Sequence, residues 1–270
     1  MTLEDEAKLQ PSHLTLPVHY WQQGSEQEKL DCIAEEVPIA MVYNGISHAV
    51  MMASPANLHE FSLGFSLSEG IINHAAEMYD IELVASKKGI EVRLEISSER
   101  MMSLKSHRRN LTGRTGCGLC GSESLETAIR PIKSVTPKAL PASPVIQHAL
   151  SQLSEHQKLQ ALTGAVHGAA WCDDTGKILL LCEDVGRHNA LDKLIGSLAL
   201  RKINPQSGFV VISSRASYEM VQKTTSANIA TLVAVSAPTG LAISLANQAK
   251  LNLIGFARPG RHTCYTKFDK

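Results

Sequence analysis

The residues of this chain best suited to covalent chemistry are two cysteines, Cys117 and Cys120, which form a Cys-x-x-Cys motif. Gly116 and Gly118 flank Cys117, and Gly121 follows Cys120, so little side-chain bulk surrounds the two sulfurs. The preceding residues 104–114 carry four basic side chains and no acidic one. Positive charge favours the thiolate, which is the reactive form of cysteine. The motif therefore predicts an accessible pair of reactive thiols.

Two other interpretations of the Cys-x-x-Cys motif remain open. A Cys-x-x-Cys turn is typical of zinc sites, which would make the chain a zinc-stabilised nucleotide-binding regulatory protein. Such a site needs two further ligands, and the chain has no second Cys-x-x-Cys. A disulfide oxidoreductase is the weaker rival, because no aromatic residue or proline lies inside the motif. The other cysteines are isolated, and a free cysteine in an apolar run mostly behaves as a small hydrophobic residue: Cys32, Cys172, Cys182 and Cys264.

Composition limits the class of protein. The chain has 270 residues, 44% of them hydrophobic, which is long enough for two domains with full cores. Its 26 basic and 26 acidic residues cancel, so overall charge gives no argument for nucleic acid as a partner. The acidic N-terminus does not resemble a signal peptide, and the apolar runs are too short to span a membrane. We therefore expect a cytoplasmic protein without a membrane partner.

The first half of the chain predicts a small α+β domain over residues 30–110, preceded by a flexible arm over 1–29. A strand-like run at 32–42 reaches Asn44-Gly45, a dipeptide typical of hairpins, and a partner strand follows at 46–53. Ser54-Pro55 resembles the start of a helix that would run to Glu69. A second hairpin is expected from 81–85 and 90–96. The predicted order is ββαββ.

The second half predicts an α/β domain over residues 111–270. We place the domain connection in the polar, basic stretch 97–114, followed by a short helix at 122–130 and an extended proline-rich segment at 131–144. Strands then alternate with helices, which indicates a layered sheet whose later strands are parallel. The expected strands are 165–172, 178–183, 209–213, 231–235 and 251–257, and the expected helices are 143–159, 188–200, 218–227 and 238–250.

Similar polar residues follow four of these strands. In open α/β sheets, ligands bind beyond the carboxyl ends of the strands. Arginine, hydroxyl groups and glycine recur there, and guanidinium groups, hydroxyls and free helix N–H groups bind phosphate. Ordinary capped loops would carry much the same residues, but their recurrence favours a cleft for an anionic ligand. The candidate residues are Arg187, Ser214, Arg215 and Thr239, with the segment 256–261 after the last strand.

Three further polar features have less specific interpretations. Glu183 and Asp184 would either accept hydrogen bonds from a ligand or orient Arg187. His167, on a strand beside a glycine, is typical of a core histidine, with a role in proton transfer or ligand contact as the alternative. Glu219 and Lys223, four residues apart on a helix, predict a surface ion pair.

Several motifs in order resemble the FdhD family, whose members are sulfur carriers needed for active formate dehydrogenases. The resemblance extends over nearly everything from about residue 30 onward. It depends on the stretches 34–38, 63–70, 116–121, 183–193, 213–219, 237–239 and 255–261.

This resemblance implies a specific activity. A cysteine desulfurase would pass sulfur to Cys117 as a persulfide, with Cys120 as the second thiol. The carrier would then deliver it to the molybdenum or tungsten of a bis-molybdopterin guanine dinucleotide cofactor, before that cofactor enters formate dehydrogenase. The residues expected to contact the cofactor are Phe256, Ala257, Arg258, Pro259, Gly260 and Arg261.

The resemblance also implies a layered α/β/α fold for the larger domain, similar to cytidine deaminase, and a homodimer. Zinc deaminases need a His-x-Glu motif and a Pro-Cys-x-x-Cys motif, and this chain has neither. We therefore expect a sulfurtransferase-like carrier that neither deaminates bases nor holds a metal of its own.

Overall fold

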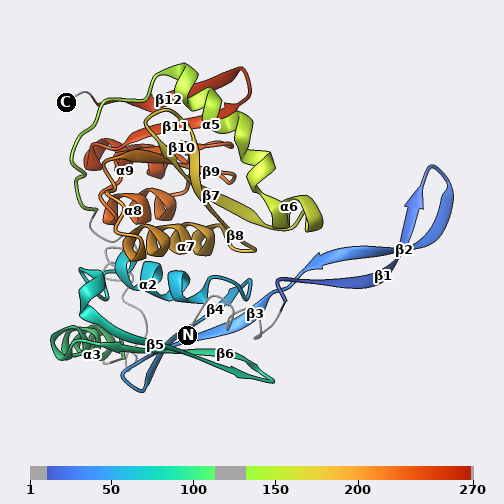
Figure 1. Ribbon diagram of the computed structural model, residues 1–270. Coiled ribbons are helices and arrows are strands. Elements are labelled where there is room, and N and C mark those ends of the chain that lie inside the picture. Colours follow the sequence, from blue (N-terminus) through green and yellow to red (C-terminus); the bar gives the residue numbers. More distant parts are fainter. Residues whose placement is uncertain (1–10, 113–131, 269–270) are drawn as a thin grey trace.

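The computed structural model describes residues 11–112 and 132–268; of residues 107–112 it describes only the backbone. The chain forms three sheets, which have two, four and six strands in the described ranges. A projecting hairpin, a small α+β unit and a larger α/β unit follow one another along the chain (Figure 1). No helix of the described residues is long and apolar enough to cross a membrane.

The N-terminal arm contains most of a long hairpin, so the prediction that residues 1–29 form a flexible arm is wrong for residues 13–29. Strands β1 (His13–Gln22) and β2 (Ser25–Ala34) are antiparallel and extend away from the body of the molecule (Figure 1). Gln23 and Gly24 both have positive φ angles, of 50° and 86°, as a two-residue turn of this kind requires. Strand β1 carries apolar Leu14, Leu16 and Val18 at every second position, a pattern typical of a strand, although both faces of the hairpin are largely exposed.

The next unit has the predicted ββαββ order. Its sheet runs β4-β3-β6-β5, formed by β3 (Val37–Tyr43), β4 (Ile46–Ala53), β5 (Met78–Ser86) and β6 (Gly89–Ile96). Asn44 and Gly45 form the predicted turn, with φ angles of 45° and 77°. Helix α2 (Leu58–Ser68) covers one face, and Phe61 and Leu63 enter the core of this unit.

Two boundaries of this unit differ from the prediction. Helix α2 begins at Leu58 rather than at Ser54, because Asn57 before it has a left-handed φ of 56° that is incompatible with a continuous helix. A short 3-10 helix (Ala75–Glu77) precedes β5. The stretch predicted to be a connection contains helix α3 (Ser98–Thr112), of which Met101 and Leu104 are buried. Among the described side chains of α3, only these two are apolar and buried. The rest of its sequence is mostly polar, which is why the sequence predicts a connection here.

The larger unit is a layered α/β/α structure, as predicted. Its sheet has the order β12-β11-β10-β9-β7-β8. Helix α5 (Ser143–His156) covers one face, and three helices cover the other: α7 (Arg187–Leu200), α8 (Tyr218–Ser226) and α9 (Gly240–Ala249). The strands are β7 (His167–Asp173), β8 (Ile178–Asp184), β9 (Gly208–Ile212), β10 (Thr231–Ala234), β11 (Asn252–Arg258) and β12 (Arg261–Thr266). The predicted resemblance to the cytidine deaminase fold is not shown by these observations and stays a prediction.

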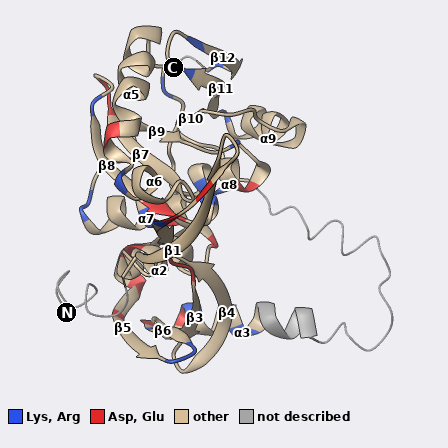
Figure 2. Ribbon diagram, turned by 90° about the vertical axis from the view of Figure 1, so that its right-hand side faces the viewer, with Lys and Arg blue, Asp and Glu red and all other residues tan. Residues whose placement is uncertain are grey.

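Strand pairing places β9, β10 and β11 parallel to one another, as expected, whereas β7 is antiparallel to both of its neighbours. Strand β12 and the short helix α6 (Lys158–Thr163) were not predicted. The two units stack through α2, which packs between α7 and the four-stranded sheet; the order of layers is also visible in the turned view (Figure 2). Helix α2 therefore belongs to both cores, and its residue Leu67 contacts each of them.

Candidate functional site

The carboxyl ends of four strands lie at one edge of the six-stranded sheet. Strand β8 is antiparallel to β7, which is antiparallel to β9, so β8 has the direction of β9, β10 and β11. The predicted gathering of strand-end residues at one edge is therefore confirmed. Strands β8 and β11 are four positions apart in the sheet, which corresponds to about 19 Å at ~4.8 Å per strand. We call this row of loops the strand-end edge.

Backbone hydrogen bonds connect neighbouring loops along this edge. Ser236 N donates to the Ser214 carbonyl at 3.4 Å, and Thr239 N donates to the Ala216 carbonyl at 3.0 Å. On the other side, Phe256 N donates to the Ser236 carbonyl at 3.1 Å. The loops after β9, β10 and β11 are thus held together beyond the strands themselves. A ligand lying across them would meet a fixed surface.

The predicted residues of the first three strand ends have different environments. Arg215 is exposed, whereas Arg187 is half-buried and its Nε has no hydrogen-bond partner among the described residues. Ser214 is buried, and its hydroxyl donates to the Arg215 carbonyl at 3.1 Å. Thr239 caps α9 and accepts a hydrogen bond from Ala242 N at 3.2 Å. The two arginines remain available to an anionic ligand, while the two hydroxyls are used to hold their loops.

The segment 256–261 forms the tight connection between β11 and β12. The backbones of Arg258 and Arg261 are opposite each other in the pairing of β11 with β12, and both residues are exposed. Gly260 in the turn has a φ of 81°, which favours glycine. Gly260 N donates to Gln147 Oε1 at 2.7 Å, so helix α5 holds the turn in place. Phe256 has a positive φ of 48°, at an irregularity in the pairing, and its side chain is 44% exposed.

Ala257 differs from its neighbours, since its methyl group is buried in the core beneath the sheet. The whole residue is buried, so it presents no surface to a ligand.

The acidic pair after β8 has a structural role. The Asp184 carboxylate is completely buried and forms an ion pair of 2.6 Å with Lys193, which is also completely buried. Asp184 also accepts hydrogen bonds from Ser54 N and Gly186 N, at 3.0 and 2.8 Å. Glu183 accepts from the backbone of α6 at Leu159 and Gln160, both at 2.8 Å. The predicted ligand contact by these carboxylates is therefore not supported, because their described partners belong to the protein.

The predicted surface pair of Glu219 and Lys223 is wrong. Lys223 turns inward, where its ammonium contacts Asp192 and Glu69, each at 2.9 Å. Burial alone would lower the pKa of Lys223, but the two carboxylates outweigh it and raise that pKa. Glu219 instead pairs with His188 of α7 at 2.6 Å. The spacing of four residues predicts that Glu219 and Lys223 contact each other on α8. In the structure, α8 packs beside α7 and α2, and each of the two side chains pairs with a residue from those neighbours.

His167 lies at the same edge, because β7 begins where β8 and β9 end. It is half-buried and lines a polar cavity of about 380 Å³ with Gln157, Gln160 and Ser213. Burial lowers the pKa of His167, and the nearby Arg187 guanidinium lowers it further. The two glutamines were missed by the sequence analysis. A glutamine at a helix end carries no signal of its own, because its role depends on which strand it faces.

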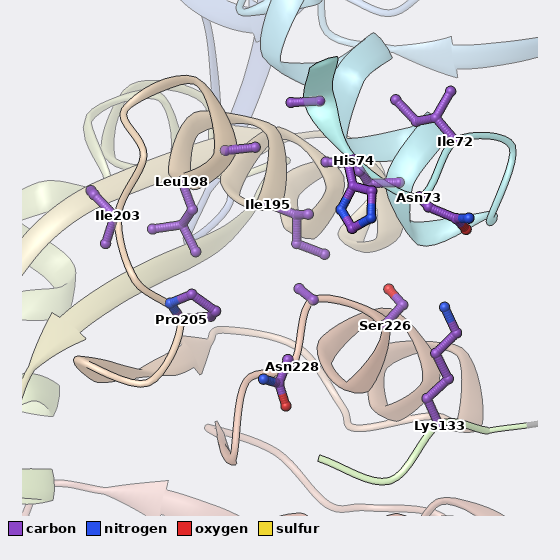
Figure 3. A pocket seen from close by; sticks show the side chains of 14 residues that line it. Ile72, Asn73, His74, Lys133, Ile195, Leu198, Ile203, Pro205, Ser226 and Asn228 are labelled. Carbon is purple, nitrogen blue, oxygen red and sulfur yellow. The ribbon is translucent and has the colours of Figure 1, made fainter. Parts of the chain in front are cut away.

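A second, mainly apolar cavity of about 290 Å³ opens at the opposite edge, where α7 and α8 end (Figure 3). Ile195, Leu198 and Ile203 form part of its wall, with His74 and Lys133 as basic side chains. It is remote from the strand-end arginines. Cys117 and Cys120 lie outside the described residues, as does the predicted helix at 122–130.

Comparison with known proteins identifies the family. The FdhD/NarQ family matches residues 34–270. Sulfur carrier protein FdhD of Cupriavidus necator is 54% identical over 94% of this chain and 88% of its own length. The protein of that name in Bordetella petrii is 50% identical over 87% of this chain and 85% of its own length.

A solved structure shows the same fold. It is that of a protein assigned as a formate dehydrogenase accessory protein from Desulfotalea psychrophila, with a TM-score of 0.74 and 24% identity over 95% of this chain and 97% of that one. With the sequence matches, which extend over most of the chain, the assignment is direct: this chain belongs to the FdhD/NarQ family.

Proposed function

We propose that this protein is a sulfur carrier that loads sulfur on Cys117 and delivers it to the bis-molybdopterin guanine dinucleotide cofactor of a formate dehydrogenase. The cofactor is cargo here and carries molybdenum or tungsten. The observation that supports this best is the strand-end edge, where four arginines lie at or just beyond the ends of β8, β9 and β11: Arg187, Arg215, Arg258 and Arg261. The relatives carry the name of sulfur carrier, which agrees with the Cys-x-x-Cys motif of this chain.

Loading would be a thiol–persulfide exchange. The Cys117 thiolate attacks the terminal sulfur of a persulfide on a cysteine desulfurase. The sulfur–sulfur bond of the donor breaks, a new one forms on Cys117, and the donor cysteine leaves as a thiolate. The four basic side chains in residues 104–114 favour the attacking thiolate through their charge.

Release would use the second thiol. The Cys120 thiolate attacks the inner sulfur of the Cys117 persulfide, so that a disulfide forms between the two cysteines and sulfide leaves for the metal. Two electrons from a thiol reductant then return both cysteines to thiols. This role explains why the chain carries two cysteines at this spacing and not one.

The strand-end edge would hold the cofactor during delivery. Each nucleotide half of the cofactor carries a pyrophosphate, and guanidinium groups bind such groups through paired, charge-assisted hydrogen bonds. The half-buried Arg187 suits this role, because its Nε lacks a hydrogen-bond partner among the residues that the structure describes. We also propose that the protein delivers sulfur as a homodimer. Light scattering during size-exclusion chromatography tests this by measuring the mass of the protein in solution.

Intact mass spectrometry tests the loading step. The protein is incubated with a cysteine desulfurase and cysteine, and we expect added mass equal to one sulfur atom. Cys117→Ala should abolish this addition, whereas Cys264→Ala, which removes an exposed thiol far along the sequence, should not. Sulfur addition that survives in Cys117→Ala would refute the assignment.

Metal analysis of the same preparation distinguishes a sulfur carrier from the alternative, a zinc-stabilised regulatory protein. Stoichiometric zinc that is lost from Cys117→Ser, together with no sulfur addition in the natural protein, would make the motif a metal site.

A further inference from the structure

The apolar cavity remote from the strand-end arginines lies in the seam between the two units, and none of the residues proposed to bind the cofactor lines it (Figure 3). The end of α2 and the loop after it form one side, and the ends of α7 and α8 with the loops after them form the other. A second hollow, also of about 290 Å³, adjoins it, and Leu67, Lys133 and Ser226 line both. A ligand here would contact both units.

The walls of this cavity are divided by polarity. Ile195, Leu198 and Ile203 lie on one side, whereas Ser226 and Lys133 lie on the other (Figure 3). Ile203 is only partly buried, so apolar surface remains open to the cavity. Apolar walls with a few polar groups that point inward are typical of sites for small molecules. The arrangement favours a ligand with an apolar body and one polar end.

The backbone that carries Lys133 is anchored by the residues that follow it. Val135 is buried, and its N donates to the Ala249 carbonyl of α9 at 2.9 Å. Thr136 N donates to Asn228 Oδ1 in the loop after α8, also at 2.9 Å. Only the side chain of Lys133 therefore has to be ordered when a ligand binds, and a site that is largely formed beforehand costs less to occupy.

The polar end of the cavity has positive charge. No aspartate or glutamate is among the described residues that line it. Glu69, in the adjoining hollow, is bound to Lys223 at 2.9 Å. Lys133 itself has no ion-pair partner in the described part of the chain. Its ammonium is thus available to an anion, and His74 in the same lining can donate from the ring nitrogen that carries its proton.

We propose that this cavity binds a small amphipathic monocarboxylate, with the carboxylate on Lys133 and the hydrocarbon chain against Leu198 and Ile203. Because a water molecule occupies ~30 Å³ in the liquid, the cavity admits roughly ten non-hydrogen atoms, the size of octanoate. A phosphate would meet a single ammonium and an apolar wall, which suits it poorly. A monocarboxylate needs one cation, and its methylene groups gain from leaving water. The inference goes beyond sulfur transfer and does not depend on it.

Equilibrium dialysis with octanoate, octan-1-ol and octylammonium tests the inference on the full chain. Octanoate should bind with a dissociation constant of about 1 mM or below, octan-1-ol more weakly, and octylammonium more weakly still. Lys133→Gln keeps most of the side-chain length and removes the charge. We expect it to weaken octanoate binding about threefold to fivefold and to leave octan-1-ol unchanged. Lys88→Gln, exposed in the turn between β5 and β6, is the matched control and should change neither.

Ile203 tests the apolar wall. Ile203→Asp should abolish binding of both octanoate and octan-1-ol, because it places a charge where the hydrocarbon chain would lie. Ile203→Ala, which removes apolar contact without adding charge, should weaken both ligands to the same extent. Circular dichroism of each variant shows whether the fold is kept.

The outcomes are separable from those of the sulfur-loading experiment. Equal octanoate affinity in the natural protein, Lys133→Gln and Ile203→Ala would overturn the placement. Equal loss of octanoate and octan-1-ol in Lys133→Gln would overturn the pairing of the ammonium with a carboxylate. No octanoate binding to the natural protein would overturn the site. If Ile203→Asp then also lowered the mass found by light scattering, the cavity would be an interface between copies of this chain instead. Sulfur addition to Cys117, measured by intact mass, is independent of all four results.

Discussion

Gly64 of α2 and Gly196 of α7 lie against each other where the two helices cross. A Cβ atom on Gly64 would overlap the carbonyl oxygen of Asp192, and one on Gly196 would overlap that of Glu60. The backbones of the two helices are therefore in direct contact. This crossing joins the four-stranded unit to the larger one.

Replacing either glycine by alanine should separate the helices. We expect Gly64→Ala and Gly196→Ala each to lower the free energy of unfolding by about 1–3 kcal/mol or more, as overpacking of a filled core does. Urea unfolding followed by circular dichroism measures this. Gly240→Ala at the start of α9 is the control, since its Cβ would meet nothing within 4 Å. A stability loss at Gly240 as large as that at Gly64 would contradict the explanation.

Lys193→Met should be strongly destabilising. The change leaves the buried Asp184 carboxylate without its cation, and removal of one partner of a buried pair costs about 3–5 kcal/mol. The same unfolding experiment applies. The control is Asp174→Asn, which breaks the more exposed pair of Asp174 with Lys138 and should cost at most about 1 kcal/mol. If both variants lower the free energy of unfolding by the same amount, burial does not determine how much these ion pairs contribute to stability.

Arg187→Ala and Arg215→Ala should each weaken binding of guanosine diphosphate by roughly tenfold or more, because each removes a charge-assisted hydrogen bond of about 1.5–3 kcal/mol. Calorimetry measures the two affinities. Arg93→Ala removes an arginine from β6, in the other unit, and should leave the affinity unchanged. If both the Arg187 and the Arg215 variant bind guanosine diphosphate with unchanged affinity, its phosphates do not bind at the ends of β8 and β9.

The double variant Arg258→Ala, Arg261→Ala should load sulfur normally and fail to deliver it. Both side chains are exposed at the turn between β11 and β12, where they can contact a cofactor and not the core. Intact mass reports loading, and formate dehydrogenase activity in cells that carry only this variant reports delivery. Failure to load sulfur, or normal dehydrogenase activity, would show that this turn does not hold the cofactor.

Stability should fall as the pH is lowered through the range of histidine titration. The pKa values of His167 and His188 are both lowered in the folded protein, mainly by burial. The unfolded chain then binds more protons than the folded one below about pH 6.5, so stability rises with pH across that window and is complete above it. His167→Phe should flatten part of this slope. A natural protein whose unfolding free energy is constant from pH 7.5 to about pH 5 would contradict this prediction.

Much of the local structure followed from the sequence because its signals are short-range. Asn44-Gly45 can adopt the left-handed angles of a tight turn, and the structure places a hairpin there. The alternation of strands and helices after residue 165 predicted the parallel strands β9, β10 and β11. The long motifs around Cys117 and Asp184 also gave the family, which the comparisons confirmed.

Other features depended on partners far apart along the chain. The sequence placed Glu219 and Lys223 together by helix spacing, whereas Lys223 in fact binds Glu69 from the other unit. Likewise, the alternating apolar residues of β1 belong to a hairpin only because β2 pairs with them, and that pairing is a property of the folded chain.

The sequence by itself therefore determined the thiol motif, the Asn44-Gly45 turn, the ββαββ order of the small unit, the alternation of strands and helices after residue 165, and the family. Each of these depends on residues that are adjacent along the chain or repeat with a fixed period. Only the tertiary structure decided that β7 enters the sheet between β8 and β9, and that Gln157 lies on Gly168 beside His167. Such contacts join segments that approach each other only when the two cores are packed, and no local propensity encodes them.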